Sequence, residues 1–256
     1  MIHPTAIIDP SAKLAAGVTL GAYSIIGADV TLGENCWIGP HAVVSGPSVF
    51  GAENKIFQHT SIGEMPQDLK YHGEPTTLIV GDRNVFRECA TVHRGTVGGG
   101  GETRIGNDNL FMAYTHVAHD CIVGNKTIFS NAASIAGHVI VDDHAILGGF
   151  TSVHQFTHIG QHSMTGLGSV LTNDAPPYTI LAGNRARCVS INKEGLARRG
   201  FSDDAIKALH KSFRLLLKST KTRQQALEEL QPLLEKHTEV KNFVDFVIQS
   251  KRGIAR

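Results

Sequence analysis

The chain has 256 residues, and its 24 Lys and Arg nearly balance its 23 Asp and Glu, which leaves a formal net charge of +1. This balance excludes the excess positive charge of a general nucleic-acid-binding protein, so we expect no nucleic-acid partner. No apolar run approaches the length of a membrane span, and an apolar repeat begins at Ile2 with no room for a leader. We therefore predict a cytoplasmic protein with no stable membrane insertion.

An apolar residue recurs at every sixth position through most of the chain. These anchors run from Ile2 to Ile62, return from Val80 to Val92, and continue from Ile105 to Ile159 before the pattern fades near Thr165. A six-residue period is typical of a parallel β-helix, in which each hexad forms one short strand and one corner and three hexads close one coil. The sequence therefore predicts a mainly β fold built as a solenoid.

The fifth position of each hexad is small or β-branched, as at Ala6, Val18 and Cys36. We expect the first and fifth positions to point into the coil, because only small groups fit beside the anchor near a crowded axis. Cys36 and Cys121 occupy this inward position and are predicted to be buried free thiols. Cys121 is close in sequence to His119, but its inward phase argues against a role as a nucleophile.

Two segments interrupt the repeat. The first, residues 64–78, is polar and contains Asp68, Lys70 and a Gly-Glu-Pro turn. The second, HRGTVGGGGETR at 93–104, is rich in glycine, but no Gly-Lys-Ser/Thr motif or helix follows it. A flexible flap is therefore a better interpretation of the second segment than a phosphate-binding loop. Loops that leave a rigid scaffold often carry binding residues.

The chain changes character near Gly195. Ser202 is a predicted N-cap, the apolar residues after it fall at helical spacing, and two further helices are predicted at Arg223–His237 and Val240–Ser250. We expect these helices to cap the last coil, because an open coil end exposes apolar surface. The predicted organisation is a catalytic β-helix domain of residues 1–190 and a C-terminal α-helical domain of residues 191–256.

Several histidines fall at outward positions in the middle of the repeat, so we expect them not to be core residues. They are His93, His116, His119, His138 and His154. Because one coil is three hexads, residues 18 apart should lie about 4.8 Å apart on successive coils. This register places His119 beside Gly137 and Gln155, and Asp120 beside His138.

After allowance for the second interruption, His93 aligns with His154, so the histidines gather on a few coils of one face. A neutral imidazole can take a proton from a hydroxyl group, and an adjacent carboxylate can fix its tautomer and stabilise the imidazolium. The Gly137 N–H could stabilise the oxyanion of an acyl-transfer intermediate, an effect worth about 3 kcal/mol. A single outward histidine could simply lie on a solvent-exposed face. Several on one patch, beside an acid and a glycine N–H, favour acyl transfer.

Longer motifs carry a resemblance to a known family. The segments GEMPQDLKYHGEPT, RECATVHRGTVGGGG, HVAHDCIVGN, AGHVIVDD, GGFTSVHQF and NKEGLARRGF resemble those of the UDP-N-acetylglucosamine O-acyltransferases, which begin lipid A synthesis in Gram-negative bacteria. The resemblance extends over essentially the whole chain. It implies a left-handed parallel β-helix, a hand that the periodicity alone does not give. It also implies a homotrimer with active sites in the clefts between subunits.

The resemblance implies a reaction as well. A (3R)-hydroxyacyl group would pass from the phosphopantetheine thioester of acyl carrier protein to the 3-hydroxyl of UDP-N-acetylglucosamine, with no further cofactor, no metal and no covalent acyl-enzyme. His119 would be the general base, Asp120 its support and the Gly137 amide the oxyanion donor.

Further positions match residues of the family that bind substrate. Those near the sugar and the acyl donor are Asp68, Lys70, His116, His138, His154 and Gln155, and the register adds His93 to them. Asn192, Glu194 and Arg199 match residues near the uridine and the phosphates. Arg198 would help to dock the carrier protein.

Two features bear on the acyl donor. Lys207, Lys211, Arg214 and Lys218 recur at helical spacing and predict one basic helix face, which suits an acidic carrier protein. Leu167 stands where the family limits acyl-chain length, and glycine there leaves room for a longer chain. We therefore predict a medium-length hydroxyacyl chain.

Three alternatives compete with this interpretation. Other hexapeptide acyltransferases lack the combination of the DLKYHGEP loop and the RRGF motif. A zinc enzyme of the γ-carbonic anhydrase type uses a similar fold, but it needs three converging imidazoles, and the spacing of His116 and His119 is too short for that family. A non-enzymatic solenoid should have flat, repetitive faces, without charged loops and a histidine cluster.

Overall fold

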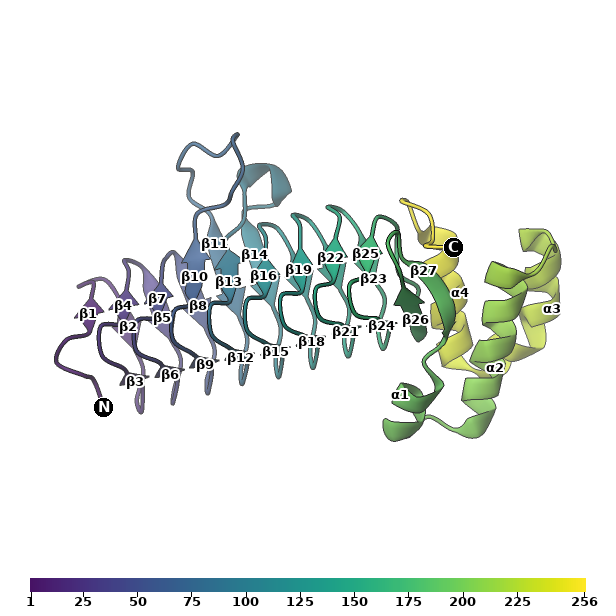
Figure 1. The fold of residues 1–256 in the computed structure, drawn as a ribbon, viewed down its shortest axis with the longest axis horizontal. Coiled ribbons are helices and arrows are strands. Elements are labelled where there is room, and N and C mark those ends of the chain that lie inside the picture. The colour runs from purple at the N-terminus through teal and green to yellow at the C-terminus, as the bar shows by residue number, and fades with distance from the viewer.

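The computed structural model describes residues 1–256 as a long three-sided β-helix with a group of helices at its C-terminal end (Figure 1). The strands form three sheets of nine, eight and ten strands, in which neighbouring strands come from successive coils. All of these pairs are parallel except the last, β26 with β27. Most strands have only two residues, because each face of the coil takes a third of an 18-residue turn.

The nine-stranded sheet contains β1 (Ile7–Ile8), β4 (Ile25–Ile26), β7 (Val43–Val44), β10 (Ser61–Glu64), β13 (Thr91–His93), β16 (His116–Val117), β19 (Ser134–Ile135), β22 (Ser152–Val153) and β25 (Val170–Leu171). The eight-stranded sheet contains β2 (Lys13–Leu14), β5 (Val30–Leu32), β8 (Ser48–Phe50), β11 (Thr77–Val80), β14 (Glu102–Ile105), β17 (Ile122–Val123), β20 (Ile140–Val141) and β23 (His158–Ile159). The ten-stranded sheet contains β3 (Thr19–Leu20), β6 (Trp37–Ile38), β9 (Lys55–Ile56), β12 (Val85–Phe86), β15 (Leu110–Phe111), β18 (Ile128–Phe129), β21 (Ile146–Leu147), β24 (Met164–Thr165), β26 (Thr179–Ala182) and β27 (Arg187–Ile191).

The phase of the hexad explains the core. Anchors such as Ile38 and Ile56 and fifth-position residues such as Cys36 and Ala42 are fully buried, as predicted. The fourth position has a positive φ at corner after corner, for example 57° at Asn35 and 60° at Asp120. Asn, Asp and His tolerate this left-handed backbone better than most residues, which explains why they recur there.

Two ladders run along the interior. The rings of Phe86, Phe111 and Phe129 follow one another with centroids 4.8 Å apart at each step, stacked in the first pair and tilted by 39° in the second. The amide of Asn84 donates to Asn54 and accepts from Asn109. The buried polar groups of the ladder are therefore paired with one another, which removes the cost of burying them.

The interruptions leave the register of the coils intact. Residues 18 apart pair in uninterrupted coils, as His116 does with Ser134. Across the two interruptions Ile62 pairs with Val92, and Val92 with Val117. The inserted residues project from the β-helix as two loops on the same side, one between β10 and β11 and the other between β13 and β14 (Figure 1). The second loop contains a short 3₁₀ helix, η1 (Val97–Gly99).

The helices begin near their predicted positions, with additions. A short α1 (Lys193–Arg198) precedes α2 (Asp203–Phe213), whose predicted N-cap Ser202 accepts from the Ala205 N–H. Helix α2 continues as a π-helical turn, η2 (Arg214–Lys218), and then come α3 (Arg223–Lys236) and α4 (Thr238–Gln249). The sequence reasoning missed α1 and the π turn. No helix in the structure combines the length and the apolar character that a membrane crossing requires.

Candidate active site

A cavity of about 450 Å³ lies on the nine-stranded sheet, where β13, β16, β19 and β22 are neighbours. Its lining contains Gln67, His93, His116, Ala118, His119, Ser134, Ile135, Ala136, Gly137, Ser152, Val153 and Gln155. The predicted column of His119, Gly137 and Gln155 is therefore present, with two more of the predicted histidines beside it.

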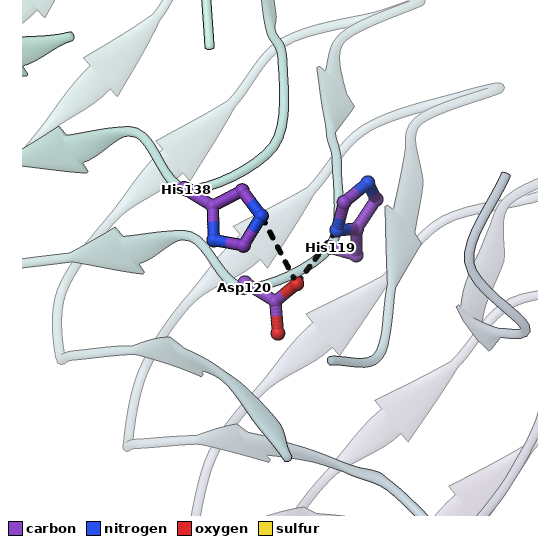
Figure 2. Close-up of side chains that lie close together, drawn as sticks. All are labelled: His119, Asp120 and His138. Carbon is purple, nitrogen blue, oxygen red and sulfur yellow. Dashed lines mark hydrogen bonds and ion pairs between the residues drawn. The ribbon is translucent and has the colours of Figure 1, made fainter. Parts of the chain in front are cut away.

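His119 and Asp120 form a hydrogen-bonded pair at the edge of this cavity (Figure 2). The distance from His119 Nδ1 to Asp120 Oδ2 is 2.7 Å, and the Asp120 side chain is fully buried. An ionised carboxylate can only accept, so Nδ1 carries the proton of this hydrogen bond, and in the neutral imidazole Nε2 then keeps a free lone pair. His119 is 16% exposed, which leaves that lone pair accessible to a ligand.

On the next coil, His138 lies beside Asp120 and Gly137 lies beside His119. His138 Nε2 lies 3.7 Å from Asp120 Oδ2 (Figure 2), and its ring stacks on Phe156. A Cβ added to Gly137 would lie 2.7 Å from Cε1 of His119, so only glycine fits beside the imidazole. The Gly137 N–H donates to no atom of the protein, and a donor beside the imidazole is therefore available to a ligand.

His93 and His116 are held as neutral imidazoles. Burial lowers the pKa of His93 to about 4, with the nearby His116 as a second cause, and burial also lowers the pKa of His116. The hydroxyl of Thr91 lies 2.7 Å from His116 Nδ1 and fixes that ring. His93 corrects one expectation: it points away from the coil axis, but only 5% of it is exposed.

The remaining predicted residues of this face are more peripheral. His154 is exposed and does not line the cavity, and its Nδ1 lies 3.3 Å from the Arg252 guanidinium. Asp68 and Lys70 lie on the first loop, where the Asp68 carboxylate accepts from the Lys70 N–H. Gln67 of that loop reaches the cavity.

A second hollow, of about 750 Å³, lies beside β21, β24 and β26 of the ten-stranded sheet. Its lining includes all four predicted residues of the NKEGLARR motif, namely Asn192, Glu194, Arg198 and Arg199. The structure therefore places the histidine cavity and the Asn192–Arg199 hollow beside different sheets and does not unite them within one chain.

Two residues of the second set have structural contacts. Asn192 is buried, and its side chain caps α1 by accepting from the Gly195 N–H. Arg199 donates to the His144 carbonyl, and burial lowers the pKa of its guanidinium. Glu194 and Arg198 are exposed, with 3.8 Å between their charged groups.

The predicted basic face borders a third hollow, of about 830 Å³, between α1, α2, η2 and α3. Lys207, Lys211, Arg214 and Lys218 all line it. Lys218 is less free than predicted, because its ammonium donates to the Cys188 carbonyl. The other three side chains are exposed on the helix surface.

Comparisons with known proteins assign this geometry to a family. A family model described as Udp N-acetylglucosamine O-acyltransferase, Domain 2, matches residues 174–255. The solved structure of LpxA from Acinetobacter baumannii is 45% identical, with a TM-score of 0.96 and coverage of 100% of this chain and 99% of that chain. The UDP-N-acetylglucosamine O-acyltransferase of Moraxella catarrhalis is 44% identical, with the same TM-score and coverage. That of Bacteroides fragilis is 38% identical, with a TM-score of 0.97 and full coverage of both chains.

The chain belongs to the UDP-N-acetylglucosamine O-acyltransferase family. It is an acyltransferase, and the left-handed β-helix with a C-terminal helical part is confirmed. The zinc-lyase and scaffold alternatives are wrong, as is assignment to another hexapeptide acyltransferase.

Cys121 has no chemistry to offer this acyltransferase. Burial raises the pKa of its thiol to about 12. Its Sγ lies inside the coil and donates to the Ala136 carbonyl. A thiol that stays protonated is a poor nucleophile, which agrees with the inward phase seen in the sequence.

One donor from each of His119, Asp120 and His138 lies within 4.8 Å of the others, so the three residues need testing as a metal set. Their hydrogen bonds fit a proton better than a metal ion. His119 Nδ1 carries the hydrogen that Asp120 accepts, and both oxygens of Asp120 already accept from Thr96. The absence of a metal ion from this site remains a prediction, which metal analysis of the purified protein tests.

Sequence reasoning missed the groups that hold Asp120. Thr96, on the glycine-rich loop, donates twice to its carboxylate, and Gly99 packs against it. This part of the loop therefore has defined contacts with Asp120, which the expectation of a flexible flap did not include. The glycine run was the one signal in the sequence, but the hexad register does not extend into an inserted loop.

Proposed function

We propose that this acyltransferase moves a (3R)-hydroxyacyl group from acyl carrier protein to the 3-hydroxyl of UDP-N-acetylglucosamine, the first step of lipid A synthesis. The observation that supports it most is the His119–Asp120 pair, with a free imidazole nitrogen beside an unpaired glycine N–H. Names of related structures describe the same acceptor for those proteins.

The geometry suits direct transfer. His119 Nε2 takes the proton of the 3-hydroxyl as its oxygen attacks the thioester carbonyl, and Asp120 stabilises the imidazolium that forms. The Gly137 N–H donates to the oxyanion of the tetrahedral intermediate. The intermediate then collapses, the C–S bond breaks, and the imidazolium returns its proton to the departing thiolate.

The two sets of residues divide the substrate between them. Asp68, Lys70, His93, His116, His138, His154 and Gln155 would surround the sugar and the acyl group. Neutral His93 and His116 offer hydrogen bonds to sugar hydroxyls without adding charge. Asn192, Glu194 and Arg199 would lie near the uridine and the phosphates, where Arg199 supplies a positive charge.

We propose a homotrimer because one chain holds only half of a site on each of two sheets. A ring of three copies brings the histidine cavity of one subunit to the Asn192–Arg199 hollow of the next. Exposed aromatic side chains at the corners, Tyr114, Phe150 and Phe156, are 67%, 66% and 53% exposed. A neighbouring subunit would cover such side chains.

The carrier protein would dock on the C-terminal part. We propose residues 1–190 as the catalytic domain and 191–256 as the helical domain, with Arg198, Lys207 and Lys211 facing the acidic partner. All three side chains are exposed. Lys207 and Lys211 line the hollow between the helices, and Arg198 lines the hollow beside the ten-stranded sheet. Opposite charges at such a surface mainly speed association.

Product analysis tests the proposal. We expect purified protein to form an ester on O-3 of UDP-N-acetylglucosamine when given a (3R)-hydroxyacyl carrier protein. Without acceptor, intact-mass analysis should show no acylated protein, and Cys121→Ser should remain active. A stable acyl-protein adduct, or transfer only to a different acceptor, would overturn it.

A further inference from the structure

The glycine-rich turn Thr96–Gly101 closes over the buried carboxylate of Asp120. The Thr96 N–H lies 2.7 Å from Oδ1, and the Thr96 hydroxyl lies 2.7 Å from Oδ2. Oδ2 is the same oxygen that accepts from His119 Nδ1. A carboxylate can only accept, so both groups of Thr96 are donors here.

Gly99 packs directly against the Asp120 carboxylate. A Cβ at position 99 would lie 2.0 Å from Cγ of Asp120 and 2.2 Å and 2.4 Å from its two oxygens. A Cβ at Gly98, by contrast, would meet nothing within 4 Å, and neither residue has a positive φ. Gly100 and Gly101 do have positive φ values, of 104° and 85°, which explains the rest of the glycine run.

We propose that the turn Thr96–Gly101 is a positioning element of the catalytic pair, in which Thr96 and Gly99 fix the Asp120 carboxylate against His119. This inference rests on the proposed role of His119 as the base. The turn makes no hydrogen bond to His119 and does not line the cavity, so it acts through Asp120.

The Thr96 hydroxyl also shares the negative charge on Oδ2. If that donor is lost, more of the charge faces His119, and its imidazolium becomes more stable. The other titratable groups around the pair are His93, His116 and His138. No hydrogen bond joins any of them to Thr96, but His138 Nε2 lies 3.7 Å from the same Oδ2. The titration of His119 itself, and not the kinetic profile alone, therefore decides between the two histidines.

The glycine pair supplies a matched test of position. Gly99→Ala should push the carboxylate away from His119 and lower kcat about ten- to a hundredfold, because displacements near 1 Å have such effects. The KM for UDP-N-acetylglucosamine should change little, since the turn does not line the cavity. Gly98→Ala, one residue earlier, should match wild type. Equal kcat values for the two variants, both folded by circular dichroism, would overturn the proposal.

Thr96→Val and Thr96→Ser test the hydroxyl. In Thr96→Val the acidic limb of the kcat/KM profile should move up by about half a pH unit, which lowers kcat/KM about threefold on that limb and little on the plateau. Thr96→Ser should restore the wild-type limb. A purely structural role would lower the whole profile evenly and leave the limb in place, which would contradict the proposal.

The protonation of His119 can also be measured without turnover. The ring-proton NMR signal of His119, assigned by its absence in His119→Gln, should titrate at higher pH in Thr96→Val. An unchanged titration would overturn the proposal even if kcat falls. Substantial activity in His119→Ala would instead sink the proposed function, whereas inactive His119→Ala with wild-type-like turn variants sinks only this inference.

Discussion

Two glycines set how closely the backbone approaches the His119–Asp120 pair. A side chain at Gly137 would collide with the His119 ring, and one at Gly99 would collide with the Asp120 carboxylate. The αL backbone at Asp120 and His138 aims both side chains from one corner of successive coils. Residue chemistry and backbone shape therefore act together at this site.

Leu167 tests acyl-chain selection at the scale of one residue. It is 79% exposed within one chain, and its Cδ1 lies over Gly149, 3.1 Å from where a Cβ would stand. Leu167→Gly should free this space and shift preference toward longer hydroxyacyl donors. Competition between donors of different length measures the shift, with Ile7→Gly, an exposed residue of β1 at the other end of the solenoid, as control. An unchanged chain-length profile would count against the role of Leu167.

His93 gives a pH dependence whose sign is defined. Its folded pKa of about 4 lies below the unfolded value of 6.5, so the unfolded chain binds the extra proton between them. The stabilising contribution is complete above pH 6.5 and disappears as the pH falls toward 4, by about 3 kcal/mol per chain. Urea unfolding of His93→Gln should lose less stability over this range than wild type does. A slope equal to that of wild type and of the exposed control His3→Gln would contradict the assignment.

At the scale of elements, the hexad made the solenoid predictable because each unit repeats the same burial problem. Register arithmetic placed His119 beside Gly137 and His93 in line with His154, since coils of 18 residues leave no freedom of alignment. Thr96 and Gly99 could not be placed, because an inserted loop follows its own contacts. The π turn after Phe213 has no periodic signature either, and the apolar spacing there fits an α-helix as well.

The basic face of α2 provides a test at the same scale. The double variant Lys207→Glu, Lys211→Glu should weaken binding of the acidic carrier protein at low salt and leave nucleotide binding intact. The matched control is Lys13→Glu, Lys55→Glu, two exposed lysines on solenoid strands far from the helices. Affinity by calorimetry decides the matter. Equal carrier-protein affinity for the two variants would refute the docking site.

At the scale of the whole molecule, the proposed homotrimer can be tested, because it joins the histidine cavity of one subunit to the Asn192–Arg199 hollow of the next. Chains carrying His119→Ala and chains carrying Arg199→Ala should each be nearly inactive alone. Trimers refolded from an equal mixture should regain roughly a quarter of wild-type activity, because one interface in four then joins two intact halves. Sedimentation must first show folded trimers for both variants. No recovery in mixed trimers would place both halves of the site in one subunit.

The central claim is transfer of a hydroxyacyl group with His119 as base. The most direct measurement compares wild type and His119→Ala with a panel of (3R)-hydroxyacyl carrier proteins and UDP-N-acetylglucosamine, with the linkage determined by NMR. We predict an O-3 ester with medium-length donors and a fall of at least about a hundredfold in the variant. No product with any donor from folded wild-type protein, or near wild-type activity in His119→Ala, would contradict the account.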